Sequence, residues 1–107
     1  MDFHTFLFHI APLATVKAED FESALRTDVM PKIDTGQTRA GRITAAVAYR
    51  TSNGHYRLLV DVETMTGSAW AMGRLRSAID AIGEIGVIYA EDDMQRVVTA
   101  ADGHLGT

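Results

Sequence analysis

The sequence predicts an α+β protein of the ferredoxin-like class, with its elements in the order β-α-β-β-α-β. Two runs with helical apolar spacing alternate with four strand-like runs, and an Asn-Gly turn joins the middle pair of strands. In this split βαβ arrangement the sheet is antiparallel and both helices lie on one of its faces. The 107 residues are expected to form a single domain over 1–107, with a frayed tail at about 102–107.

The first strand is predicted at about 3–10 and is closed by Pro12, because proline cannot donate a hydrogen bond to a strand ladder. The first helix is predicted at about 17–29. Thr15 is its candidate cap, and Pro31 is expected to end it.

The middle of the chain indicates a hairpin. Strands are predicted at about 42–50 and about 56–63, and Asn53 and Gly54 mark the turn between them. On the third strand Leu58 and its alternate neighbours predict one apolar face.

The last third of the chain predicts a helix at about 68–82, capped by Gly83, and a strand at about 86–91. The acidic run Glu91-Asp92-Asp93 is interpreted as a solvated turn. Residues 94–101 fit either a short strand or a helical turn.

Composition excludes several classes of function. The net charge is −4, and no basic run suggests a nucleic-acid partner. Cysteine is absent, which excludes disulfides and thiolate chemistry and fits a cytoplasmic location. The N-terminus lacks the features of a signal peptide, and no apolar stretch approaches the roughly 20 residues of a membrane span.

The first two strands are apolar on both faces, although two helices cover only one face of a small sheet. In the first strand one face carries Phe6, Phe8 and Ile10, and the other carries Phe3 and Leu7. In the second strand, strict alternation predicts one face with Ile43, Ala45 and Val47 and another with Thr44, Ala46 and Ala48. Exposing the large side chains would forfeit about 1.5–3 kcal/mol each, so we expect a homodimer.

The chain resembles the dimeric α+β barrel superfamily, and most closely its antibiotic biosynthesis monooxygenase-like group, over about residues 3–91. The resemblance rests on Glu19-Asp20-Phe21-Glu22, Val29-Met30-Pro31, Arg42-Ile43-Thr44, Val60-Asp61-Val62-Glu63 and Trp70. It implies a homodimeric barrel with a pocket between each sheet and its helices. Members of the group include cofactor-free oxygenases of polyphenolic anthrones, haem-degrading enzymes and polyketide cyclases.

The haem-degrading branch fits this chain poorly. Trp70 matches its helix-2 tryptophan, but residues 71–90 contain no histidine to ligate iron. The first strand has His4 and His9 but no asparagine, which that branch uses there. No cofactor and no metal are therefore predicted.

Two histidines are the candidate catalytic residues. His4 and His9 are an odd number apart on one strand, so they are expected to point to opposite faces. Either one, facing the pocket, would suit a general base; the alternative is a histidine packed against the backbone.

The candidate substrate-binding residues are Trp70, Tyr49, Arg57 and Asp61. Arg57 and Asp61 are expected on one face of the third strand, as a substrate-orienting pair; the alternatives are a polar sheet edge or an intersubunit ion pair. Trp70 and Tyr49 are candidate pocket walls, with ordinary core packing as the alternative.

The function predicted is binding of a small aromatic or polyketide-like ligand, with cofactor-independent monooxygenase activity. Two alternatives remain open: a non-catalytic ligand-binding or assembly module, and a cyclase or isomerase on the same scaffold.

Overall fold

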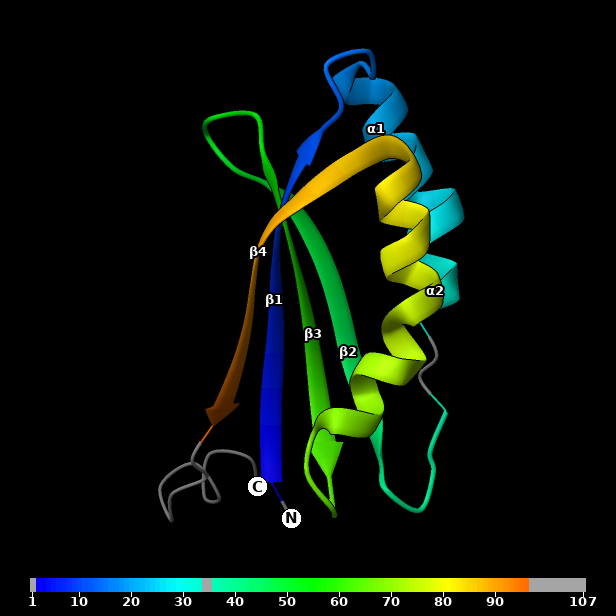
Figure 1. Ribbon diagram of the computed structural model, residues 1–107, viewed down its shortest axis with the longest axis vertical. Helices are drawn as coiled ribbons and strands as arrows, with labels where there is room; N and C mark the ends of the chain where they lie inside the picture. Colours follow the sequence, from blue (N-terminus) through cyan, green and yellow to red (C-terminus); the bar gives the residue numbers. More distant parts are fainter. Residues whose placement is uncertain (1, 34–35, 97–107) are drawn as a thin grey trace.

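The computed structural model describes residues 2–33 and 36–96. The four strands form one antiparallel sheet in the order β2-β3-β1-β4, and both helices lie on the same side of it (Figure 1). The elements are β1 (Asp2–Pro12), α1 (Ala18–Ala24), β2 (Gly41–Arg50), β3 (Tyr56–Thr64), α2 (Ala69–Ile85) and β4 (Gly86–Arg96). This confirms the predicted ferredoxin-like fold.

The first helical segment is longer and less regular than predicted. Lys17 precedes α1 and no side chain caps the helix, so the cap expected at Thr15 is wrong. The segment continues through a π-helical turn, Leu25–Val29, and a 3₁₀ turn, Met30–Lys32. The α- and π-helical stretch ends at Val29, close to the end predicted from Pro31. Pro31 itself lies in the 3₁₀ turn that follows, where its missing N–H has no partner to lose.

The C-terminal elements also run past their predicted ends. Gly83 lies exposed inside α2, so the cap predicted there is wrong, and the chain turns into β4 at Gly86. A side chain at Gly86 would come within 2.8 Å of the Phe21 ring, which explains a glycine at this crossing. The acidic run Glu91–Asp93, interpreted as a turn, lies within β4. Residues 97–107 lie outside the described residues.

A β-bulge in β2 changes which residues share a face. Ile43 pairs with Val62, but Ala45 pairs with Asp61, so Thr44 is the extra residue. Ile43 therefore shares the helix-covered face with Ala46, and the strict alternation predicted for this strand is wrong. The β-propensity of the residues does not predict such a bulge.

The core lies between the sheet and the helices. Beneath the helices the apolar side chains of β1 and β3 are buried, with Phe8, Val60 and Val62 at 0% exposure. From the helices Phe21, Leu75 and Ile82 pack onto it. We call this side of the sheet the covered face.

The opposite side of the sheet, which we call the open face, has no element over it in the described part of the chain (Figure 1). Val47 and Val87 each expose about half of their surface there, and Tyr89 does the same. No helix in the described ranges is long and apolar enough to cross a membrane.

Candidate functional site

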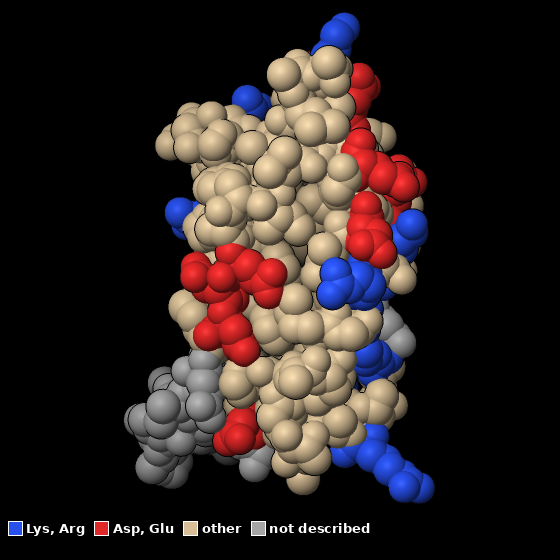
Figure 2. Space-filling view, viewed as in Figure 1, with Lys and Arg blue, Asp and Glu red and all other residues tan. Residues whose placement is uncertain are grey.

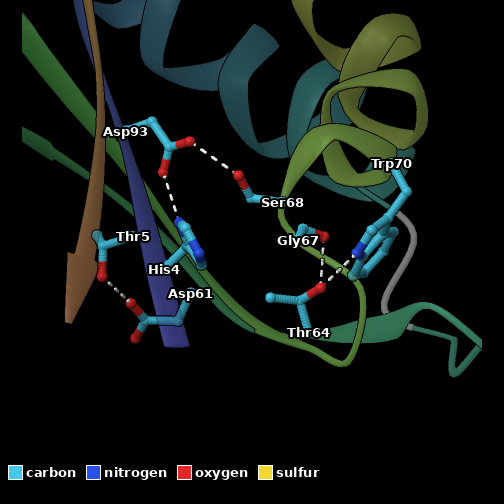
Figure 3. A network of polar contacts seen from close by, with 8 residues as sticks. All are labelled: His4, Thr5, Asp61, Thr64, Gly67, Ser68, Trp70 and Asp93. Atoms are coloured by element: carbon cyan, nitrogen blue, oxygen red, sulfur yellow. Dashed lines mark hydrogen bonds and ion pairs between the residues drawn. The ribbon is translucent and has the colours of Figure 1, made fainter. Parts of the chain in front are cut away.

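Asp93 joins the sheet to the start of α2 on the covered face. One of its carboxylate oxygens lies 2.9 Å from His4 Nδ1, and the other accepts a hydrogen bond of 2.9 Å from Ser68 Oγ (Figure 3). His4 comes from β1 and Asp93 from β4, while Ser68 directly precedes α2. We call these three residues the Asp93 cluster.

Local structure explains how the chain builds this cluster. Ser68 occupies the N-cap position of α2, but its hydroxyl makes no capping bond to the helix. The hydroxyl donates a hydrogen bond to Asp93 instead. On the strands, Asp93 lies opposite Phe6, two residues from His4, so both side chains project to the covered face.

Glu91 and Asp93 both project to the covered face of β4, whereas Asp92 projects to the open face. Figure 2 shows acidic side chains gathered over β4, where Glu91, Asp92 and Asp93 follow one another. The side chain of His4 is only 13% exposed, against 41% for Asp93.

Trp70 lies at the same end of α2 and is held by its polar edge. Its Nε1 donates a hydrogen bond of 2.9 Å to Thr64 Oγ1, and Thr64 is completely buried (Figure 3). The Thr64 hydroxyl donates in turn to the Gly67 carbonyl. The indole is therefore fixed in one orientation over β3 and β2.

Gly41 makes room for the tryptophan. A Cβ at this position would lie 2.8 Å from the indole ring and 2.1 Å from the Glu63 carbonyl oxygen. Its φ of +149° is also a conformation that other residues rarely adopt. Only glycine lets β2, β3 and Trp70 approach this closely.

The second histidine lies on the open face, as the odd spacing predicted. His9 Nε2 is 3.6 Å from Asp92, which is too long for a hydrogen bond, and its ring lies 5.7 Å from that of Tyr89. Tyr89 also contacts His55, at 3.1 Å between the hydroxyl and Nδ1. This row of aromatic and imidazole rings is a feature of the uncovered surface.

The remaining predicted residues also lie on the open face. Arg57 lies opposite Tyr49 and His9. Asp61 lies opposite Thr5 and accepts a hydrogen bond of 2.8 Å from the Thr5 hydroxyl. Arg57 and Asp61 thus share one face, as predicted. His4 and Trp70 both lie on the covered face, His4 against β4 and Trp70 over β3 and β2. The other four lie on the opposite side of the sheet.

Sequence reasoning missed two of the residues that organise the site. Asp93 looked like part of a solvated turn, because aspartate is rare in strands. Ser68 had no motif around it. In the described part of the chain, no three acidic or histidine side chains converge as a metal site would require.

Comparison with known proteins supports the fold. No family model and no curated protein matches the chain. Among solved structures, a "putative antibiotic biosynthesis monooxygenase" from Bordetella bronchiseptica superposes with a TM-score of 0.61 and 16% sequence identity. The match covers 91% of this chain and 99% of that one. The two proteins share one fold. The resemblance predicted from the sequence is thus supported at the level of the fold.

Proposed function

We propose that this chain is a homodimeric, small-molecule-binding member of the antibiotic biosynthesis monooxygenase-like group. It acts as a cofactor-independent monooxygenase on an aromatic or polyketide-like substrate, in the cytoplasm. The observation that carries the proposal is the Asp93 cluster, in which a carboxylate held by Ser68 contacts His4. His4 is the proposed base.

Asp93 prepares His4 for proton transfer. A carboxylate accepts hydrogen bonds, so His4 Nδ1 carries the proton in this contact and Nε2 keeps its lone pair. When Nε2 takes a proton, the adjacent negative charge stabilises the imidazolium. Because the second oxygen of Asp93 is bound by Ser68, the carboxylate stays aligned with the ring.

The chemistry requires only the base and oxygen. In an anthrone-like substrate, His4 removes a proton from the methylene carbon between two aromatic rings, leaving an electron-rich carbanion. This anion reduces molecular oxygen, and the methylene becomes a carbonyl while the second oxygen atom leaves as water. Trp70, fixed by Thr64, supplies a flat apolar surface for the substrate rings.

Homodimerisation is the second part of the proposal. The open face exposes Val47, Tyr89 and Val87, each by about half. Val47 lies on one edge strand and Val87 and Tyr89 on the other, and exposed apolar side chains of this kind favour a two-fold contact with a second copy. Arg57 and Asp61 lie on the same face, so we place them at the dimer contact, with Asp61 held by Thr5.

The test is oxygen uptake with the anthrone dithranol, after dialysis against a chelator. We expect turnover by the wild type, and a loss of about 100-fold or more in His4→Gln, because general-base catalysis contributes about 10²–10⁴. His9→Gln, the matched change on the open face, should retain most of the activity.

Each alternative has its own signature in this assay. Conversion of a polyketide-like substrate without oxygen uptake would identify a cyclase or isomerase that uses the same base. Binding without any turnover would identify a non-catalytic module. Full activity of His4→Gln would show that His4 is not the base.

A further inference from the structure

A hollow lies between the first helical segment and the edge strand β2, at the end of the sheet away from the Asp93 cluster. Its volume is about 440 Å³. It exists because β2 presents alanines to the covered face, Ala46 opposite Val60 and Ala48 opposite Leu58. The helical segment therefore meets small side chains at this edge and leaves a groove, which we call the β2 groove.

A phenol and a carboxylate line one end of the β2 groove. The Tyr56 hydroxyl donates a hydrogen bond of 2.6 Å to Glu22 Oε1. Burial, this hydrogen bond and the charge of Glu22 raise the pKa of Tyr56 to about 12, against the opposing effect of Arg50. Tyr56 thus stays protonated and holds one oxygen of Glu22, which leaves the other for a ligand.

Two arginines line the groove. Arg26 and Arg50 carry positive charge there beside the negative Glu22, and the charge of Glu19 also reaches Tyr56. Within the described ranges no ion pair involves Arg26, Arg50 or Glu22. Arg50 lies opposite Tyr56 in the ladder, so its side chain projects to the same face as the phenol.

The helix backbone changes character at the groove. The π-helical turn begins at Leu25, and Leu25 and Arg26 both line the hollow. π-helical turns occur frequently at functional sites. Here the turn lies directly against a groove that combines an apolar wall, including Met30, with charged groups at its end.

We propose that the β2 groove binds a small hydroxyaromatic carboxylate. The apolar ring would lie on Leu25, Met30 and the two alanines, and the carboxylate would pair with Arg50 and Arg26. The hydroxyl group of the ligand would donate to the unoccupied oxygen of Glu22. None of these residues belongs to the Asp93 cluster, so this site stands independently of the proposed monooxygenase activity.

The test is a ligand titration monitored through backbone NMR shifts. The probe is para-hydroxybenzoate, and para-hydroxybenzamide is its neutral counterpart. For the wild type we expect a dissociation constant below about 1 mM for the acid, and at least about tenfold weaker binding of the amide. The shifts should centre on Tyr56 and Leu25.

Two pairs of variants make the test specific. Arg50→Gln removes a charge from the groove, and Arg76→Gln removes an exposed arginine from α2. Ala48→Leu fills the groove, and Ala45→Leu adds the same bulk to the open face of the same strand. The first member of each pair should weaken binding about tenfold or more, and the second should leave it unchanged.

Three results would overturn the proposal. The first is a lack of saturable binding of para-hydroxybenzoate to the wild type. The second is equal affinity for the acid and the amide. The third is unchanged affinity in Arg50→Gln, when its spectrum shows an intact fold. These three binding measurements do not depend on dithranol turnover, so a failure of that assay would not affect them.

Discussion

The two faces of the sheet each carry one histidine–aspartate contact, and the two contacts differ in how they are held. On the covered face Asp93 lies 2.9 Å from His4 and is fixed from α2 by Ser68. On the open face Asp92 lies 3.6 Å from His9 and is 57% exposed. Adjacent acids of one strand thus meet different surroundings, and only the helix gives its carboxylate a second anchor. An exposed pair of the looser kind contributes little, typically about 0–1 kcal/mol.

The apolar side chains of the two faces show the same contrast. Phe8 and Val60 are completely buried under the helices, whereas Val47 on the open face is 53% exposed. One face is therefore covered by the helices of the chain itself, and no element in the described part of the chain covers the other. The homodimer proposed above would cover the apolar side chains that the first strand carries on its open face.

Matched phenylalanines on β1 give the sharpest test of this contrast. Phe8→Ala should lower the free energy of unfolding by about 3–5 kcal/mol, because it leaves a cavity in the core. Phe3→Ala, on the open face, should cost about 1 kcal/mol in the monomer. Urea unfolding of both variants measures the difference.

The dependence of stability on protein concentration further distinguishes the two phenylalanine positions. If a second copy covers the open face, the wild type should gain stability with concentration, since association favours the folded state. Phe3→Ala should weaken that dependence, while Phe8→Ala should preserve it. A wild type that sediments as a monomer at micromolar concentration would contradict the dimer.

Most of the fold could be predicted from the sequence, because its signals are repeated along each element. The alternation of Tyr56, Leu58 and Val60 predicts the buried face of β3, and Asn53-Gly54 predicts the hairpin. Element ends were less predictable. They depend on single contacts, such as the close approach of Gly86 to Phe21.

The candidate site was predictable only in part, because it is assembled by tertiary contacts. His4 and Trp70 stood out by residue type, but the carboxylate that meets His4 is 89 residues away in the sequence. The β-bulge at Thr44 is equally invisible, since one inserted residue reverses the faces of the strand that follows. Neither effect leaves a periodic signal.

Two glycines test how tightly the covered side is packed. Gly41→Ala should cost about 3 kcal/mol, because the new methyl group would overlap the Glu63 carbonyl and the Trp70 ring. Gly83→Ala, in α2 with open space around it, should instead stabilise the protein by about 0.5–1 kcal/mol. Thermal unfolding checks both. If the two substitutions changed the melting temperature equally, the contact between Gly41 and Trp70 would be loose.

The smallest effect concerns the polar contact that the covered face makes with α1. Tyr56→Phe should cost about 1 kcal/mol at neutral pH, because it removes the hydrogen bond to Glu22. It should also change how stability responds to alkali. The pKa of Tyr56 is raised from 10.0 to about 12, so between these values the unfolded chain loses this proton while the folded chain keeps it.

The free energy of unfolding therefore falls as pH rises through this window. The expected fall is about 1–2 kcal/mol, below the full value that the pKa shift alone would give, as water at the end of the groove would weaken the effect. Below the lower pKa the contribution of Tyr56 is fully present, and it is lost as pH passes the upper one. Urea unfolding at pH 9 to 12 should show a shallower decline in Tyr56→Phe, with Tyr49→Phe as the exposed control. Parallel declines in Tyr56→Phe and the wild type would mean that the phenol is not held by Glu22 in solution, and that the carboxylate at the end of the β2 groove has no fixed orientation.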